Sequence, residues 1–463
     1  MKIVFRTALL LTLAGTLAAA QTAAPSDVQN EAQRPATTQA VQKSALGAAA
    51  DQSVLADNQT NITFEEILAH PDNVALNYNF ARQQVRQGDI KGAAATLQRI
   101  LMVEPDIPRV RLFYAVVLYR LDDLAESEQE LQKLRALNIT PDVQKELDAY
   151  LNAIAKRQKR DHLSGQLGLG WEFDDNRNAT PASGQFLFGG TPINASTPRT
   201  SDTSALFLAG VQELHRFSGN NEAFATFDYY RAEQTQLKSL NLQAYSVTAG
   251  DTIRTPWLWT LKPAVLYDHV LLAQSTFLRN RGLALRAERN LSRSTLFFAE
   301  VRDVFNDYVA VPTFLSAHGL SGVQVDFVAG AERALSPRQK VSLSLDYGVK
   351  HAFDNVFAYN REGIDFSHTL LFSRGLFLLS SLSLHFDQYS HLDAVISGNH
   401  RSDQTGRLSF TAGLPLALIH PKLKDLLATF TYEYYQAIST INNYAFTNNK
   451  IAALLTYRWD AAF

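Results

Sequence analysis

The sequence IAALLTYRWDAAF, residues 451–463, decides the fold of the longer part of this chain. Its odd positions hold Ile451, Ala453, Leu455, Tyr457, Trp459 and Phe463. Side chains of a β-strand point alternately to opposite faces, so these residues predict one apolar face with aromatic residues toward its end. Such a face is typical of the last strand of a bacterial outer-membrane β-barrel, where it lies against lipid.

The same alternation recurs in stretch after stretch from His162 onward. In 341–347, VSLSLDY, apolar and polar residues take turns, and in 281–289 Arg286 and Glu288 alternate with leucine and alanine. Charges at this frequency on the polar face suit a water-filled interior. The pattern predicts fourteen strands, near 162–175, 200–217, 221–235, 239–253, 257–272, 276–291, 293–308, 316–334, 338–353, 359–373, 375–390, 401–415, 423–440 and 445–460. Twelve or sixteen strands are alternatives, since strand ends are predicted only to within a few residues.

The connections between these strands fall into two alternating sets. One set is short and rich in turn-forming residues, as at 218–221, 290–293, 336–338 and 373–375. The other contains the long segments 176–199, 306–316 and 391–402. Outer-membrane barrels have short periplasmic turns and longer external loops, so this parity predicts an even strand number with both ends of the barrel in the periplasm.

The rival interpretation is a soluble β-sandwich or β-helix. The aromatic residues argue against it, because all four tryptophans lie in the strand-rich part: Trp171, Trp257, Trp259 and Trp459. Most are near predicted strand ends, where an interfacial aromatic girdle places them. We therefore expect residues 161–463 to form an outer-membrane β-barrel that contacts outer-membrane lipid. We also expect the barrel-assembly machinery to recognise the face formed by Leu455, Tyr457, Trp459 and Phe463.

Composition restricts the possible functions. The formal net charge of −2 gives no overall field that would attract nucleic acid. The absence of cysteine excludes disulfides, thiol catalysis and thiolate metal sites, and it leaves no residue for an N-terminal lipid anchor. Beyond the first residues, no apolar run approaches the ~18 residues of a membrane-spanning helix.

The N-terminal residues predict export. Lys2 and Arg6 precede an apolar stretch, and Ala18 to Ala20 form a small-residue cleavage site, so residues 1–20 are predicted to be a signal peptide. Residues 21–63 lack aromatic residues and are rich in Ala, Gln, Ser, Thr and Asp. They are predicted to be a disordered linker, since such a segment buries too little apolar surface to offset its ordering entropy.

Residues 64–160 change to helical periodicity and repeat every 34 residues. Pro71 and Asp72 recur as Pro105 and Asp106. At the same offset, Ala81 matches Ala115, Ala93 matches Ser127, Leu97 matches Leu131, and Ile100 matches Leu134. This period, with small residues where paired helices approach each other, is typical of tetratricopeptide repeats. A final helix from Pro141 to about Lys159 is predicted to cap the array.

Two repeats and a cap can form a shallow groove. We expect the first helix of each repeat to line it, with Tyr78, Arg82, Arg86, Leu112, Tyr119 and Arg120. Grooves of this kind bind peptides, so peptide binding and plain structural support are both open interpretations.

The sequence contains no recognisable catalytic motif. Ser383, His385 and Asp387 share one strand face, but residues two apart on a strand are separated by about 7 Å and cannot relay a proton directly. His391 and His400 lie in a loop with Asp393 and Asp403, which is a weak pattern for a metal site. We therefore expect no enzymatic activity, no cofactor and no metal ion.

The order of these parts resembles the surface lipoprotein assembly modifier family, known as Slam. The resemblance is carried by the Pro-Asp repeats at Pro71 and Pro105, by the strands from Leu163 to Phe463, and by turns that begin with Leu-Ser and contain arginine, at Leu291 and Leu335. It implies an α+β protein of the cell outer membrane, with its helical domain in the periplasm. It also implies a translocon for a specific client: a surface lipoprotein or a secreted haem- or metal-scavenging protein, brought alone or by a periplasmic chaperone.

Two alternatives are an exopolysaccharide export porin and a general diffusion porin. Exopolysaccharide exporters usually carry many more repeats, and this sequence has no ladder of tryptophans for sugar. In a diffusion porin the helical domain would be superfluous.

Overall fold

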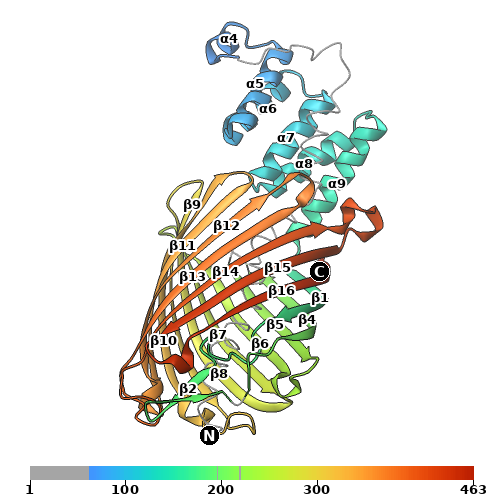
Figure 1. The fold of residues 1–463 in the computed structure, drawn as a ribbon. Helices are drawn as coiled ribbons and strands as arrows, with labels where there is room; N and C mark the ends of the chain where they lie inside the picture. The colour runs from blue at the N-terminus through green and yellow to red at the C-terminus, as the bar shows by residue number, and fades with distance from the viewer. Residues whose placement is uncertain (1–61, 196, 218–220, 463) are drawn as a thin grey trace. The chain divides into compact units, whose positions relative to one another are not determined.

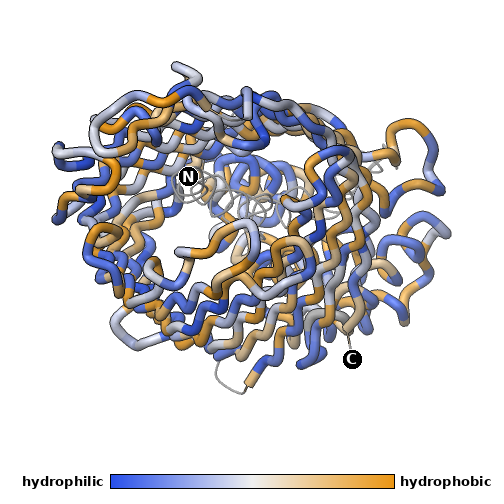
Figure 2. Tube along the Cα trace, turned by 60° about the horizontal axis from the view of Figure 1, so that its bottom comes forward, coloured by the Kyte–Doolittle hydropathy of each residue, from blue (hydrophilic) through white to orange (hydrophobic). Residues whose placement is uncertain are grey.

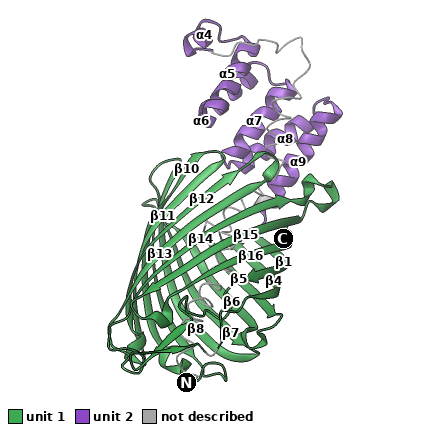
Figure 3. Cartoon of the chain, viewed as in Figure 1, with its two compact units in different colours: residues 1–29, 161–461 green, residues 30–160, 462–463 purple. Residues whose placement is uncertain are grey.

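A computed structural model describes residues 62–195, 197–217 and 221–462. Two compact units appear in it, a helical unit that ends at Arg160 and a β unit from Asp161 onward (Figure 3). The predicted signal peptide, nearly all of the predicted linker and Phe463 lie outside the described residues. None of the described helices is both long and apolar enough to cross a membrane.

From Ile62 onward the helical unit contains six helices (Figure 1): α4 (Phe64–Ala69), α5 (Val74–Gln87), α6 (Ile90–Val103), α7 (Pro108–Arg120), α8 (Leu124–Arg135) and α9 (Pro141–Gln158). Local sequence fixes their ends. Thr63 and Glu66 form a capping box that begins α4, and the side chains of Asn73, Asp89 and Asp123 cap α5, α6 and α8. Helices α7 and α9 start with proline, whose missing N–H would have had no partner there.

The 34-residue period reflects two similar helix pairs, α5–α6 and α7–α8. Each residue of the four predicted matches is buried, from Ala81 and Ala115 to Ile100 and Leu134. Ser127, the polar member, satisfies its hydroxyl by donating to the carbonyl of Ala115 at 2.8 Å. The predicted tetratricopeptide packing is therefore confirmed, with small residues at the close contacts between helices.

The β unit is a closed antiparallel barrel of fourteen strands in which each strand pairs with its sequence neighbours and β1 pairs with β16. The strands are β1 (Asp161–Asp174), β4 (Asp202–Arg216), β5 (Glu222–Gln234), β6 (Leu242–Arg254), β7 (Trp259–Leu272), β8 (Ser275–Asn290), β9 (Thr295–Tyr308), β10 (Gly322–Ser336), β11 (Gln339–Ala352), β12 (Tyr359–Leu371), β13 (Phe377–Tyr389), β14 (Ser402–Pro415), β15 (Leu426–Ser439) and β16 (Phe446–Ala462). A hairpin of β2 (Gln185–Phe188) and β3 (Thr191–Asn194) lies in the first connection.

All fourteen predicted strands are present, with one notable shift. The strand predicted near 316–334 begins only at Gly322, because residues 317–320 form a 3-10 turn. Gly322 follows this turn with a φ of +146°, a conformation that favours glycine. Other 3-10 turns in the connections are Lys238–Leu240, Asn355–Phe357, Ser373–Gly375, Leu416–Leu418, Pro421–Leu423 and Asn442–Tyr444.

The predicted parity of the connections is confirmed. One end of the barrel, which we call the loop end, carries 175–201, 235–241, 273–274, 309–321, 353–358, 390–401 and 440–445. The opposite turn end carries 217–221, 255–258, 291–294, 337–338, 372–376 and 416–425. Figure 2 looks toward the loop end and shows hydrophilic and hydrophobic residues alternating along the strands. Outward residues such as Leu169, Leu283 and Leu345 are more than half exposed, as a lipid-facing surface requires.

Candidate functional site

Two of the six predicted groove residues belong to the core of the helical unit. Tyr78 is 3% exposed and packs edge to face on Phe113, with ring centroids 5.6 Å apart. Leu112 is 6% exposed and packs in the cluster formed by α7, α8 and α9. These two assignments were wrong, because the first helix of each repeat contacts both its own partner helix and the next repeat.

The other four residues remain at the surface. Arg82, Tyr119 and Arg120 are half-buried, and Arg86 is exposed. The structure adds Tyr150 of α9, whose ring packs edge to face on that of Tyr119 at 5.5 Å between centroids.

Further charged residues lie near enough to Tyr78 and Tyr150 to act on them. Burial raises the pKa of Tyr78, while the positive charges of Arg82 and Arg109 oppose the increase. Burial and the charge of Glu146 raise the pKa of Tyr150, and Arg120 partly offsets this. We call Arg82, Arg109, Tyr119, Arg120, Glu146 and Tyr150 the module face. The spacing of Glu146 and Tyr150, four residues apart on one helix, is the signal that the sequence analysis missed.

Inside the barrel, the loop end of β4 to β8 carries an unexpected apolar surface. Two rows of directly opposed residues form it, Leu206–Ala232–Leu242–Leu272 and Leu208–Tyr230–Ala244–Val270–Leu278. We call these two rows the apolar wall. The sequence predicts a polar, water-filled interior. Apolar side chains on this wall must therefore be shielded from water by another part of the chain.

The cover is the β9–β10 loop, residues 309–321. Val311, Phe314 and Ala317 of this loop are at most 3% exposed and belong to the same cluster as the apolar wall. The ring of Phe314 also packs against Phe277, with centroids 6.1 Å apart. The loop is also bonded to the connection 353–358. The backbone N–H groups of Phe353 and Asp354 donate to the carbonyls of Ser321 and Gly319 at 2.7 and 2.9 Å.

A second group of loops packs together at the same end. The first connection, which contains the β2–β3 hairpin, donates backbone hydrogen bonds to two other connections. The N–H of Ala182 donates to the carbonyl of Ala445 at 3.1 Å, and those of Gly189 and Gly190 donate to the carbonyls of Val395 and Ile396 at 2.8 and 3.0 Å. Phe186 and Ile396 share an apolar cluster with Tyr435, Tyr444 and other residues of β15 and β16. Three connections far apart in sequence therefore hold one another in place.

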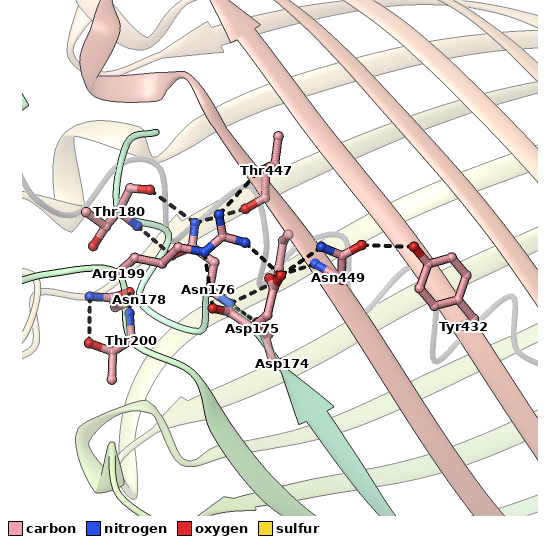
Figure 4. A network of polar contacts seen from close by, with 11 residues as sticks. Asp174, Asp175, Asn176, Asn178, Thr180, Arg199, Thr200, Tyr432, Thr447 and Asn449 are labelled. Carbon is pink, nitrogen blue, oxygen red and sulfur yellow. Dashed lines mark hydrogen bonds and ion pairs between the residues drawn. The ribbon is translucent and has the colours of Figure 1, made fainter. Parts of the chain in front are cut away.

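The closing pair of strands is secured at this end by the polar network of Figure 4. The carboxylate of Asp175 accepts from the backbone and side-chain N–H groups of Asn449 at 2.8 and 2.7 Å and from Arg199 at 2.7 Å. The Tyr432 hydroxyl donates to Asn449 at 2.9 Å. Burial raises the pKa of Asp175, but these donated hydrogen bonds and the Arg199 charge outweigh it and hold the pKa below the usual value.

The predicted assembly signal lies on the outer surface of β16. Leu455 and Tyr457 are 44% and 45% exposed, and they pair with Ala428 and Leu426 of β15. Trp459 packs over Gly165 of β1, where a Cβ would lie 2.3 Å from the indole ring. Phe463 lies outside the described residues. Recognition by the assembly machinery stays a prediction.

Comparisons with known proteins find a repeat family and a curated relative that match parts of this chain. The tetratricopeptide repeat family matches residues 84–145. A protein of Moraxella catarrhalis named Surface lipoprotein assembly modifier is 29% identical over 131 residues, which cover 28% of this chain and 25% of that protein. The match therefore spans about a quarter of the length of that curated relative.

One solved structure with a similar fold is that of Acinetobacter baumannii OccAB3. It has a TM-score of 0.35 and 9% identity, and the alignment covers 65% of this chain and 99% of the other. A bacterial polysaccharide outer membrane secretin has a TM-score of 0.33 and 10% identity over 64% and 98%. Structural similarities with TM-scores this low carry no information about function. The chain combines a tetratricopeptide module with a closed fourteen-strand β-barrel, and its predicted resemblance to the surface lipoprotein assembly modifiers is confirmed by a relative of that name.

Proposed function

We propose that this protein is an outer-membrane translocon that delivers a specific client protein to the cell surface. The client is a surface lipoprotein or a secreted haem- or metal-scavenging protein. In this proposal the loop end faces the exterior, and the helical unit lies in the periplasm and receives the client or its chaperone. The name of the Moraxella relative supports this class of client. The proposal includes no enzymatic step.

The observation that carries the proposal is the apolar wall beneath the β9–β10 loop. Small hydrophilic solutes and polysaccharides need a polar path, and a buried apolar surface offers them no partner. An extended polypeptide presents apolar side chains at every second position, so it can pack on such a wall once the loop moves aside. The loop covers the wall at rest with Val311, Phe314 and Ala317.

The module face supports a role in client handling. Exposed or half-buried arginines beside two packed tyrosines can bind an acidic or amphipathic segment through charge and stacking. Contacts of this kind are sensitive to salt, because the participating charges are accessible to solvent.

The first experiment measures client display after deletion of residues 64–159. The barrel should still fold, as judged by heat-modifiable migration in gels, while surface display of a lipoprotein or secreted protein encoded by a neighbouring gene collapses. Arg82→Glu/Arg120→Glu should cause a smaller loss of display relative to wild type, and this difference should shrink as salt screens the exposed charges. The matched control is Lys91→Glu/Arg135→Glu, which makes the same charge change at exposed residues of α6 and α8.

The outcomes separate the alternatives. Loss of polymer secretion with normal client display would identify a polysaccharide exporter. Normal display of every co-encoded protein by a module-deleted barrel at normal level would contradict the proposal and leave a diffusion porin.

A second experiment uses the absence of native cysteine. Ala182→Cys/Ala445→Cys places two thiols across a backbone hydrogen bond of 3.1 Å between the first and last loops. The oxidised variant should fail to display the client, and a reductant should restore display, because the loops must separate for a polypeptide to pass. The single variants serve as controls. Equal display by the oxidised and reduced double variant would show that this loop contact stays closed during transport.

A further inference from the structure

Three inward-facing side chains from adjacent strands meet on the barrel wall. Asp346 of β11, Asp365 of β12 and His385 of β13 each present one oxygen or nitrogen atom, and these atoms lie within 4.8 Å of one another. The Nε2 atom of His385 is 3.4 Å from Asp346 Oδ1 and 3.9 Å from Asp365 Oδ2. Two carboxylates and an imidazole are a donor set used for divalent transition metals.

Strand register and one glycine create this cluster. Asp346, Gly363 and His385 are directly opposite one another on β11, β12 and β13. A Cβ on residue 363 would lie 2.1 Å from Asp346 Oδ1 and 2.3 Å from the His385 ring. Asp346 and His385 can therefore approach across the middle strand only because residue 363 has no side chain.

The spacing suits a metal ion. Two ligand atoms of a tetrahedral ion at about 2.1 Å lie about 3.4 Å from each other. The His385–Asp346 separation of 3.4 Å already has this value, and a small rotation of the Asp365 carboxylate brings the third atom in. Asp346 Oδ1 is a buried atom with His385 Nε2 3.4 Å away, and it accepts no well-aligned hydrogen bond from a described residue, so it has a lone pair available.

The surrounding charges leave the cluster negative when His385 is neutral. Arg361, the neighbouring guanidinium, is already neutralised by two hydrogen bonds to Asp387 at 2.6 and 2.7 Å. Asp326 adds a further carboxylate beside Gly348. The side chains of Asp365 and His385 are 41% and 26% exposed, so an ion can reach them from the interior.

We propose that Asp346, Asp365 and His385 form a binding site for one divalent first-row transition-metal ion on the inner wall of the barrel. Three protein ligands leave at least one coordination position toward the interior, which allows exchange with solution. The site joins three strands and is independent of the proposed translocation function.

The test uses the full chain, purified in detergent without a polyhistidine tag, and Co²⁺ as the probe. Titration should show saturable visible absorption for one Co²⁺ per chain, with displacement by Zn²⁺. Ca²⁺ and Mg²⁺ should compete poorly, because an imidazole nitrogen favours transition metals over hard cations. The ligand variant His385→Gln should weaken binding at least tenfold.

Gly363→Ala provides a sharper variant, because it removes none of the ligands. Its methyl group would meet the mobile ends of Asp346 and His385 rather than backbone, so the barrel should fold and the site should be lost. Gly348→Ala is the matched control: its Cβ would approach Asp326 Oδ1 at 2.5 Å and leave the three ligands untouched. His368→Gln changes a histidine on the opposite face of β12 and should also bind normally.

The proposal is overturned if the wild-type chain shows no saturable Co²⁺ binding. It is also overturned if Gly363→Ala and His385→Gln bind as well as Gly348→Ala, or if Ca²⁺ competes as effectively as Zn²⁺. That last result would indicate a general acidic surface in which a protonated His385 only pairs with the carboxylates.

Discussion

The two sides of the barrel interior differ although their strands follow the same alternation. Near the loop end of β4 to β8, the directly opposed inward residues Leu206, Ala232, Leu242 and Leu272 are apolar and buried. On β10 to β14 the corresponding rows are charged or glycine, as in Asp326–Gly348–Arg361–Asp387–Asp403. The apolar side lies beneath the β9–β10 loop, and the charged side is held by cross-strand ion pairs.

This difference shows that two kinds of interaction stabilise one barrel. The apolar wall needs its cover, because apolar surface facing water is unfavourable. The charged side needs internal pairing, because each buried charge requires a partner. Arg401 illustrates the second case: it donates twice to Asp403 and lies over the rings of Tyr389 and Tyr444.

The largest effect is expected from placing a charge in the apolar wall. Leu242 is fully buried, so Leu242→Asp should lower the free energy of unfolding by about 4 kcal/mol and reduce the amount of folded barrel. Thr405→Asp, opposite His385 on the charged side, is the control and should cost less than about 1 kcal/mol. Urea unfolding in detergent measures both. Equal destabilisation would remove the distinction between the two sides.

On the charged side, removal of one ion-pair partner should be almost as severe. Arg361→Met leaves the Asp387 carboxylate, whose side chain is 1% exposed, without its cation, and about 3 kcal/mol should be lost. Arg361→Met/Asp387→Leu should recover a large part of that loss, because it also removes the isolated charge. A double variant no more stable than the single one would mean that the pair contributes more than charge compensation.

A smaller and more local effect is expected in the β9–β10 loop. Phe314→Ala removes a ring that packs on Phe277, so the loop should open more readily, by about 2 kcal/mol. The melting temperature of the barrel should change little. Hydrogen exchange or limited proteolysis at residues 309–321 measures the opening. Global destabilisation with unchanged local exchange would show that the loop does not move separately from the wall.

The smallest effect concerns pH at the closing strands. The pKa of Asp175 is lowered in the folded protein, so the stabilisation it provides is complete above the unfolded value near 3.8 and is lost as the pH falls through the lower folded value. Wild-type stability should therefore decrease on acidification below about pH 4 more steeply than that of Asp175→Asn. Parallel curves for the two proteins would contradict the assigned role of the carboxylate.

The strands could be predicted from sequence because period-two alternation is a local property. The 34-residue repeat was equally local, and residues such as Ala93 and Ser127 occupy equivalent buried positions. The groove was predicted less well. Tyr78 and Leu112 have the size and spacing of groove residues, but packing between repeats buries them.

Contacts between side chains of different strands could not be predicted from the sequence. His385 was considered together with Ser383 and Asp387 of its own strand, whereas in the structure it meets Asp346 and Asp365 of neighbouring strands. Which residues oppose each other depends on the length and geometry of every intervening turn, and a shift of one residue reverses the face of each side chain. The inward folding of the β9–β10 loop was missed for the same reason, since its apolar partners lie on five other strands.

The single long-range pairing in the barrel has a consequence for how the chain folds. Every strand except the first and last finds both partners among its sequence neighbours, whereas the contact between Asp175 and Asn449 joins residues 274 positions apart. The sheet can therefore grow one hairpin at a time from short-range contacts, which form quickly. Its curvature then brings the two free edges together, because the right-handed twist of paired strands accumulates across the sheet. An error of register in any one hairpin is carried to the pairing of β1 with β16. There Trp459 packs over Gly165 of β1, where a side chain would collide with its ring.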